Sequence, residues 1–315
     1  MTRRQFPLVF AAGGALALPD RIRVAATPHL AVSPLHLAVE RGYFRQQNLE
    51  VEIIPLRRSA DAIPILAKGD MDGAFYALNP PLINAIAKGA RIRLVAARDQ
   101  ALPDCGDLAS IYARRGIASV AELKGKRVAN GAAAGIVEFA LDSALERAGL
   151  APSDIEVVRL RPNEAMAAYS RGEIDALTGP DLSNMKSLQT AGFSCLTTLG
   201  KTRPGFQHGH IAFGRRLLEG PLDLGARFLR AYFRAVTEYA GGATPAFMTE
   251  YAAQTDLDPK AVVRQCRTHV IPGGQIQLAS LDLFARWAYR KGYCEQPVDV
   301  ASLVDDRFLK ASKGK

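Results

Sequence analysis

Two segments of this chain, residues 62–74 and 165–177, share one pattern at a constant offset of 103 positions: AIPILAKGDMDGA and AMAAYSRGEIDAL. The aligned pairs are Ala62 with Ala165, Gly69 with Gly172, Asp72 with Asp175 and, beyond the segments, Gly89 with Gly192. The matches fall where helices are expected to end and strands to begin, positions at which the backbone restricts the choice of residue. The sequence therefore predicts two related folding units.

The first unit begins with residues 21–54, which read as a strand, a loop, a helix and a second strand. Ser33 is expected to cap the helix, with Pro34 at its first position, and Gly42 is expected to end it. The same order of strand, capped helix, glycine and strand recurs along the chain. Such alternation is typical of an α/β fold with mainly parallel sheets and helices on both faces.

The chain has 315 residues, which is long enough for two lobes. A polar segment, DQALPDCGD, interrupts the alternation and marks the first crossing between lobes; the chain is expected to return near residues 201–210. We predict lobe 1 from residues 18–100 and 208–315, and lobe 2 from residues 101–207. The C-terminal helices are expected to pack on lobe 1, with Phe228, Tyr232, Phe233 and Tyr239 in its core.

Residues 1–17 have the composition of an export signal. Arg3 and Arg4 precede the short apolar run Leu8–Leu16, and ALA at residues 15–17 offers a cleavage site. The order TRRQF resembles a twin-arginine signal, although a Sec signal or an uncleaved anchor stays open. The apolar run is shorter than the roughly 20 residues that a spanning helix needs. We expect a periplasmic protein.

The formal net charge is +9, and removal of Arg3 and Arg4 leaves +7. This balance suits anionic solutes or an anionic membrane surface. The basic residues are scattered and are not interleaved with aromatic residues, so we do not expect nucleic acid as a partner.

Four cysteines, Cys105, Cys195, Cys266 and Cys294, would meet an oxidising compartment after export, and they allow three full pairings. Cys266 and Cys294 fall on consecutive expected helices and could pair. Otherwise they are small buried apolar residues.

Catalytic signatures are missing from the sequence: it contains no G-x-S-x-G, P-loop, H-E-x-x-H or strand-linked G-x-G-x-x-G motif. His208 and His210 would share one face of a strand and could bind a metal, but no third ligand is close in sequence. We predict a protein that is not an enzyme and that needs neither a metal nor another cofactor.

Helix N-termini presented at strand ends are the feature that points to a ligand. In open α/β sheets, ligands bind beyond the carboxyl ends of strands, where helix starts offer unpaired amides and partial positive charge. Ser33, Ser59 and Asn79 in one unit, and Gly131–Ala134 with Asn163 in the other, are expected to line one cleft between the lobes. Each could instead be only a helix cap.

Several segments carry a family resemblance: HLAVERGYFRQQNLEVEI, ILAKGDMDGAFYALNPPLINAIAKGARIRLVAA, VAELKGKRVAN, ALERAGL and MAAYSRGEIDAL. Over residues 21–214 the chain resembles the nitrate/sulfonate/taurine-binding family of periplasmic solute-binding proteins, which includes binders and synthases of thiamine-pyrimidine precursors. The resemblance implies a bilobed, type II-like periplasmic-binding-protein fold that closes on a solute and delivers it to an ABC-type membrane permease. We also expect a monomer.

The resemblance places the ligand pocket on the loops at residues 29–34, 57–59, 76–79, 131–133 and 179–181, and at the single positions 98 and 163. The candidate ligand-binding residues are His29, Ser33, Pro34, Arg57, Ser59, Tyr76, Asn79, Arg98, Gly131, Ala132, Ala133, Asn163 and Asp181. The loop TPHLAVSP contains no tryptophan, so an aromatic clamp is not evident there.

Our first hypothesis is a transport receptor for a small organic anion, a sulfonate or a carboxylate, with Arg98 or Arg57 as its charge partner. The alternative is a receptor for a nitrogen heterocycle of the thiamine-pyrimidine type, stacked on Tyr76 and paired with Asp181. An enzyme on the same scaffold is a third possibility, which the export signal argues against. A sensor that binds solute without transporting it also stays open.

Overall fold

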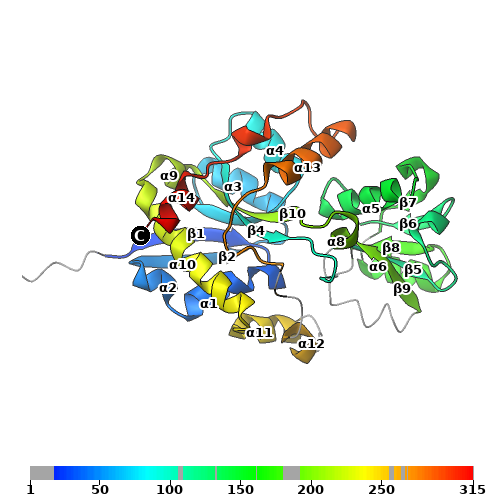
Figure 1. Ribbon diagram of the computed structural model, residues 1–315, viewed down its shortest axis with the longest axis horizontal. Coiled ribbons are helices and arrows are strands. Elements are labelled where there is room, and N and C mark those ends of the chain that lie inside the picture. The colour runs from blue at the N-terminus through cyan, green and yellow to red at the C-terminus, as the bar shows by residue number, and fades with distance from the viewer. Residues whose placement is uncertain are drawn as a thin grey trace, which may run out of the picture.

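The structure is a computed structural model of the 315-residue chain, and it describes residues 18–105, 109–131, 133–160, 162–179, 192–254, 259–263, 267 and 269–314. Two lobes, each built on a five-stranded sheet, are joined by two segments of chain (Figure 1). The predicted bilobed α/β fold is therefore confirmed. Residues 1–17, on which the expected export signal depends, lie outside the described part.

Both sheets are mixed, and their strands follow equivalent orders. In lobe 1 the order is β2-β1-β3-β10-β4, with β1 Asp20–Ala26, β2 Leu49–Pro55, β3 Gly73–Ala77, β4 Arg93–Gln100 and β10 Gln207–Phe213. In lobe 2 it is β7-β6-β8-β5-β9, with β5 Ser110–Arg114, β6 Arg127–Ala129, β7 Glu156–Val158, β8 Ala176–Thr178 and β9 Phe193–Thr198. Strands β10 and β5 run antiparallel to both neighbours, because each receives the chain as it enters from the other lobe.

Hydrogen bonds at equivalent positions confirm the internal repeat. The side chain of Asp72 accepts from the backbone N–H of Arg23 at 2.7 Å, and that of Asp175 accepts from the N–H of Arg127 at 3.0 Å. In each lobe the aspartate thus ties the start of one strand to its parallel neighbour. The aligned Gly69 and Gly172 have φ of 83° and 75°, in the left-handed region that ends a helix. The aligned aspartates and glycines can be recognised in the sequence because the backbone geometry at these positions requires them.

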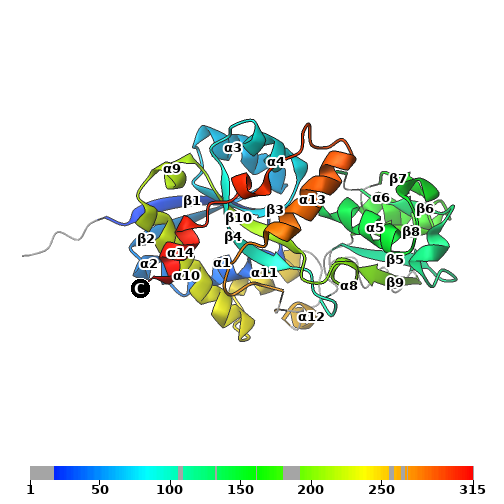
Figure 2. The same cartoon turned by 45° about the horizontal axis from the view of Figure 1, so that its top comes forward.

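Helices cover both faces of each sheet (Figures 1 and 2). In lobe 1, one face packs on α1 Ser33–Glu40, α2 Tyr43–Gln46, α10 Leu222–Ala240 and α14 Arg307–Lys313, and the other on α3 Ala62–Lys68, α4 Pro80–Ala87 and α13 Leu278–Arg290. The remaining helices of lobe 1 are α9 Arg215–Glu219, α11 Ala246–Gln254 and α12 Pro259–Val263. Lobe 2 carries α5 Ile136–Arg147 and α6 Pro162–Ser170 on opposite faces, and α8 Leu199–Thr202 follows β9 on the way back to lobe 1.

The long helix α10 fills the core of lobe 1, as the spacing of its apolar residues predicts. Phe228, Tyr232 and Tyr239 are fully buried, and Phe233 is partly buried against the same cluster. Phe228 stacks on Phe44 at a centroid distance of 5.0 Å, so α10 packs directly on the first βαβ unit. The prediction that these aromatics form the core is confirmed. Helix α14, which also contacts α10, was not expected from the sequence.

Three predicted helix starts need correction. A 3₁₀ turn at Leu30–Val32 precedes α1 and is capped by His29, so Ser33 is the first residue of α1 and not its cap. Another 3₁₀ turn opens at Ser59, and α3 begins only at Ala62. Helix α6 begins at Pro162, which places Asn163 inside it. In the first two cases a short 3₁₀ turn precedes the helix, and local capping patterns do not predict such a turn.

Asn79 caps α4 as predicted, because its side-chain oxygen accepts from the N–H of Leu82 at 3.1 Å.

The suggested pairing of Cys266 with Cys294 is wrong. Cys294 is a free thiol buried against α13, and Cys195 is also free, whereas Cys105 is disulfide-bonded. Across the described residues, none of the helices combines the length and the apolar character needed to cross a membrane.

Candidate functional site

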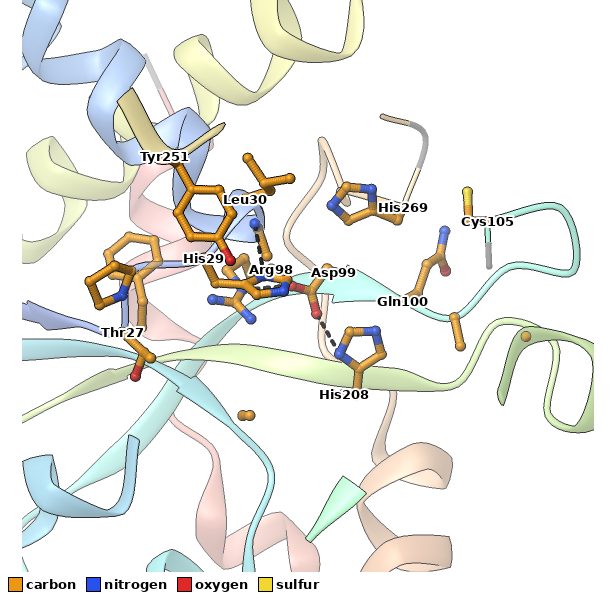
Figure 3. Close-up of a pocket in the computed structure, with 16 residues that line it drawn as sticks. Thr27, His29, Leu30, Arg98, Asp99, Gln100, Cys105, His208, Tyr251 and His269 are labelled. Carbon is orange, nitrogen blue, oxygen red and sulfur yellow. Dashed lines mark hydrogen bonds and ion pairs between the residues drawn. The ribbon is translucent and has the colours of Figure 1, made fainter. Parts of the chain in front are cut away.

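A cavity of about 360 Å³ lies in lobe 1 at the carboxyl ends of β1, β3 and β4 and the amino end of β10, where the chain leaves for lobe 2 (Figure 3). Its walls come from the loop after β1, from β3, β4, β10 and α11, and from the two connecting segments. The lining residues are Thr27, Pro28, His29, Leu30, Ala31, Phe75, Ala77, Arg98, Asp99, Gln100, Ala101, Cys105, Gly200, His208, Tyr251 and His269. Its position agrees with the rule that open α/β sheets bind ligands beyond their strand ends.

A buried ion pair lies in this cavity. Arg98 and Asp99 lie near the end of β4, and Nε of Arg98 lies 2.7 Å from Oδ2 of Asp99. Asp99 is fully buried and Arg98 is 8% exposed. Nδ1 of His208, on the neighbouring strand β10, lies 2.9 Å from the other carboxylate oxygen (Figure 3). Asp99 is thus held between a guanidinium and an imidazole.

The charge of Asp99 is fixed by these neighbours. Burial alone would raise the pKa of Asp99, but the charges of Arg98 and His208 lower it far below its usual range. Asp99 is therefore ionised at neutral pH and balances the charge of Arg98. Three imidazoles, from His29, His208 and His269, line the same cavity.

His29 is oriented by the local fold. Its Nδ1 accepts from the backbone N–H of Ala31 at 3.2 Å, which caps the 3₁₀ turn before α1. The ring lies edge-on to Tyr251 at a centroid distance of 6.4 Å. The loop after β1 and helix α11 therefore meet at one wall of the cavity.

His210 lies behind this cavity, in the core. It is fully buried, and within the described part of the chain neither ring nitrogen has a hydrogen-bond partner. Burial lowers its pKa from 6.5 to about 3; the charge of Asp99 opposes this effect, and His208 and Arg98 add to it. His210 is therefore neutral in the folded protein near neutral pH.

We expect this histidine to make the protein sensitive to acid. Between pH 6.5 and about 3 the unfolded side chain binds a proton that folded His210 does not, so stability falls as the pH falls through this window. From pH 7.5 to pH 5 the loss from His210 is about 2 kcal/mol. Urea unfolding at the two pH values should therefore show a smaller difference for His210→Leu than for the unchanged protein. Equal differences would contradict the assignment.

The candidate residues from lobe 1 divide into two groups. His29 and Arg98 line the cavity. The others lie elsewhere: Ser33 and Pro34 are buried in α1, Arg57 is exposed after β2, Ser59 opens the turn before α3, Asn79 caps α4, and Tyr76 is buried with its hydroxyl 3.5 Å from Oδ1 of Asn79. The aromatic side chains that do line the cavity are Phe75 and Tyr251.

Among the described residues that line this cavity there is none of the lobe 2 candidates. Gly131 and Ala133 are exposed at the turn before α5, and Asn163 lies in the first turn of α6. Ala132 and Asp181 lie outside the described residues, as does the side chain of Asn163.

Sequence reasoning missed Asp99, His208 as a cavity residue, Tyr251 and His269. Asp99 could have been found from the local sequence, because a charged pair near the end of an otherwise buried strand needs partners. Tyr251 and His269 could not, since they reach the cavity only through the return of the C-terminal helices. Among the described residues there is no group of three or more His, Cys, Asp or Glu side chains that could hold a metal ion.

Comparison with known proteins agrees with this architecture. The chain is 26% identical over 294 residues to a Bacillus subtilis protein named as aliphatic sulfonates-binding, with 89% of this chain and 85% of that protein covered. It is 29% identical over 165 residues to a 4-amino-5-hydroxymethyl-2-methylpyrimidine phosphate synthase of Schizosaccharomyces pombe, with 52% of this chain covered but only 45% of that enzyme.

Among solved structures, the periplasmic aliphatic sulphonate binding protein of Escherichia coli shares the fold, with a TM-score of 0.74, 20% identity, and coverage of 91% of this chain and 92% of that one. The profile of the family described as NMT1/THI5 like matches residues 30–209, more than half of the chain. The chain therefore belongs to the NMT1/THI5-like family.

Proposed function

We propose that the protein is an exported solute-binding receptor of an ABC-type importer and that it binds a small organic anion, a sulfonate or a carboxylate, in the cavity at the end of β4. The observation that carries the proposal is the position of Arg98, nearly buried and lining a cavity of about 360 Å³. The bilobed fold and the sulfonate-binding relative support the same assignment.

Arg98 suits an anion because its guanidinium has five N–H donors in a fixed fork, of which Nε is next to Asp99. The carboxylate holds the guanidinium in one orientation and leaves its other nitrogens for a ligand. Apolar side chains such as Leu30, Phe75 and Tyr251 form the rest of the wall and suit the organic part of the solute.

The cavity also touches both connections between the lobes. Ala101 and Cys105 follow β4, and Gly200 lies in α8 on the returning segment. A solute bound here would contact the segments about which the lobes can rotate. We propose that hinge closure accompanies binding and presents the closed form to a membrane permease.

The same cavity supports a second candidate, a neutral nitrogen heterocycle of the pyrimidine type. The observation in its favour is the one-to-one pairing of Arg98 with Asp99, which leaves the cavity without an excess fixed charge. We favour a receptor over an enzyme because the sulfonate-binding relative matches along 85% of its length, whereas the pyrimidine phosphate synthase matches along 45%.

A thermal-shift panel tests the proposal, with alkanesulfonates, nitrate, aromatic carboxylates and aminopyrimidines as probes. A solute at 100 times its Kd adds about 2.7 kcal/mol of stability. At roughly 2–4 °C per kcal/mol this corresponds to a rise in melting temperature of about 5–10 °C. We expect this rise with a sulfonate or carboxylate; a rise with aminopyrimidines alone would select the heterocycle.

Arg98→Lys and Arg57→Lys form a matched pair of variants. Arg98→Lys keeps a positive charge beside Asp99 but loses the forked guanidinium, so we expect the rise in melting temperature with the anionic probe to disappear. Arg57 is exposed and does not line the cavity, so Arg57→Lys should respond like the unchanged protein. Loss of the shift in Arg57→Lys with retention in Arg98→Lys would move the site away from this cavity.

A further inference from the structure

The two lobes also meet at an interface that is separate from the cavity. Helix α5 of lobe 2 lies beside α13 of lobe 1 (Figures 1 and 2). Phe139 of α5 stacks on Phe206 at a centroid distance of 4.8 Å and meets Phe284 and Trp287 of α13 edge-on at 5.6 and 5.5 Å. This apolar centre buries Phe139 and Trp287 almost completely.

Polar contacts surround the apolar centre. Nε1 of Trp287 donates to Oδ2 of Asp142 at 2.8 Å, and Nζ of Lys291 lies 3.1 Å from Asp142 and 3.2 Å from Glu138. The hydroxyl of Tyr293 lies 3.0 and 3.1 Å from the two carboxylate oxygens of Glu138. Two acidic side chains of lobe 2 are thus held by three side chains of lobe 1.

Glu138 connects this interface to the turn that follows β6. Its Oε2 accepts from the backbone N–H of Ala134 at 2.7 Å, and its Oε1 lies 3.0 Å from the guanidinium of Arg159. Ala134 has φ of 56°, a conformation that costs a residue with a Cβ roughly 1–2 kcal/mol. Gly135, the N-cap residue just before α5, makes no side-chain cap, so Glu138 holds the start of the helix.

We propose that the contact between α5 and the end of α13 is a latch that sets the orientation of lobe 2 relative to lobe 1, and that Glu138 is a positioning residue through which the latch holds Ala134. The latch consists of Glu138, Phe139 and Asp142 on lobe 2, and of Trp287, Lys291 and Tyr293 on lobe 1. It goes beyond the proposed function, because it concerns how the lobes are held and not which solute binds.

The charges within the latch support this assignment. Burial would raise the pKa of Glu138, but the N–H of Ala134 and the side chains of Arg159 and Tyr293 lower it below its usual value. Burial would lower the pKa of Lys291, whereas Asp142 and Glu138 raise it. Both groups therefore stay charged at neutral pH, and Lys291 and Glu138 form an ion pair at 3.2 Å across the interface.

Lys291→Met combined with Tyr293→Phe tests the latch from the lobe 1 side and leaves lobe 2 unchanged. Trp287 is the one tryptophan of the chain, so its fluorescence reports directly on the interface. We expect its emission maximum to move to longer wavelength. We also expect the amide of Ala134 to exchange with solvent roughly tenfold faster, since the loss of charged hydrogen bonds loosens Glu138.

The matched control is Lys88→Met combined with Tyr289→Phe. Lys88 pairs with Glu295 at 2.6 Å within lobe 1, and Tyr289 is an exposed residue of α13. This variant should leave both signals unchanged. Unchanged exchange at Ala134 in the latch variant, or an equal change in the control, would overturn the proposal.

If the latch variant fails to fold, Glu138→Gln decides the question on its own. The substitution keeps the size of the side chain but removes the charge that Arg159 and Lys291 compensate. Faster exchange at Ala134 supports the proposal, and unchanged exchange contradicts it. No solute is added in these measurements, so their outcome is independent of the thermal-shift panel.

Discussion

Asp99→Asn is expected to lower the free energy of unfolding by about 3–5 kcal/mol, the usual result of breaking a buried ion pair. The substitution preserves the shape of the side chain and removes its charge. Arg98 is 8% exposed and would then be buried beside a neutral amide. The pairing with His208 would also be lost. Urea unfolding monitored by circular dichroism measures the change.

The control is a pair of the same residue types on the surface. Arg58 and Asp61 lie 2.8 Å apart, with the Arg58 side chain 79% exposed, so Asp61→Asn should change the stability far less than Asp99→Asn does. Removal of both buried charges in Arg98→Met/Asp99→Leu should recover most of the stability, since apolar residues replace a buried pair at little cost. Similar losses of stability in Asp99→Asn and Asp61→Asn would show that burial does not determine how much the Arg98–Asp99 pair contributes to stability.

Gly200→Ala is expected to destabilise the protein by about 3 kcal/mol or more. Gly200 lies in α8, where alanine would normally be favoured over glycine by about 1 kcal/mol. Here a Cβ would overlap the backbone carbonyl of Leu102, on the segment that leaves β4. Because the neighbour is backbone rather than a flexible side chain, the clash outweighs the gain in helix propensity.

Gly273→Ala is the matched control, because a Cβ at Gly273 would meet no atom within 4 Å. We expect a change of less than about 0.5 kcal/mol there. Thermal unfolding of the two variants provides the comparison, together with the anionic probe, since Gly200 also lines the cavity. Normal stability of Gly200→Ala would show that the two connecting segments do not approach as closely as described.

The sequence determined the features that depend on local backbone geometry. Gly42, Gly69 and Gly172 end helices in the left-handed conformation, as expected of residues without a Cβ. Asn79 caps its helix, and Asp72 and Asp175 occupy equivalent positions in the two sheets. Each of these roles is settled by neighbours in the chain or by one parallel strand pair, so the repeat and the two-lobed α/β architecture could be predicted.

Tertiary structure decided which side chains meet. Asp99 and His208 are 109 positions apart, and Glu138 and Tyr293 are 155 apart, yet each pair is in contact. Such contacts depend on the crossing of the chain between the lobes and on the return of the C-terminal helices, and no local pattern encodes them. Tyr76 and Ser33 were singled out by position, but the packing of lobe 1 buries them away from the cavity.

The sequence by itself therefore determined the folding unit and its duplication. Only the tertiary structure decided that Arg98 faces a carboxylate, that Tyr251 and His269 complete the cavity, and that α5 is held against α13. The physical reason is the separation along the chain over which each interaction acts. Backbone conformation is fixed over a few residues, whereas buried charges and apolar faces pair with residues from distant parts of the chain.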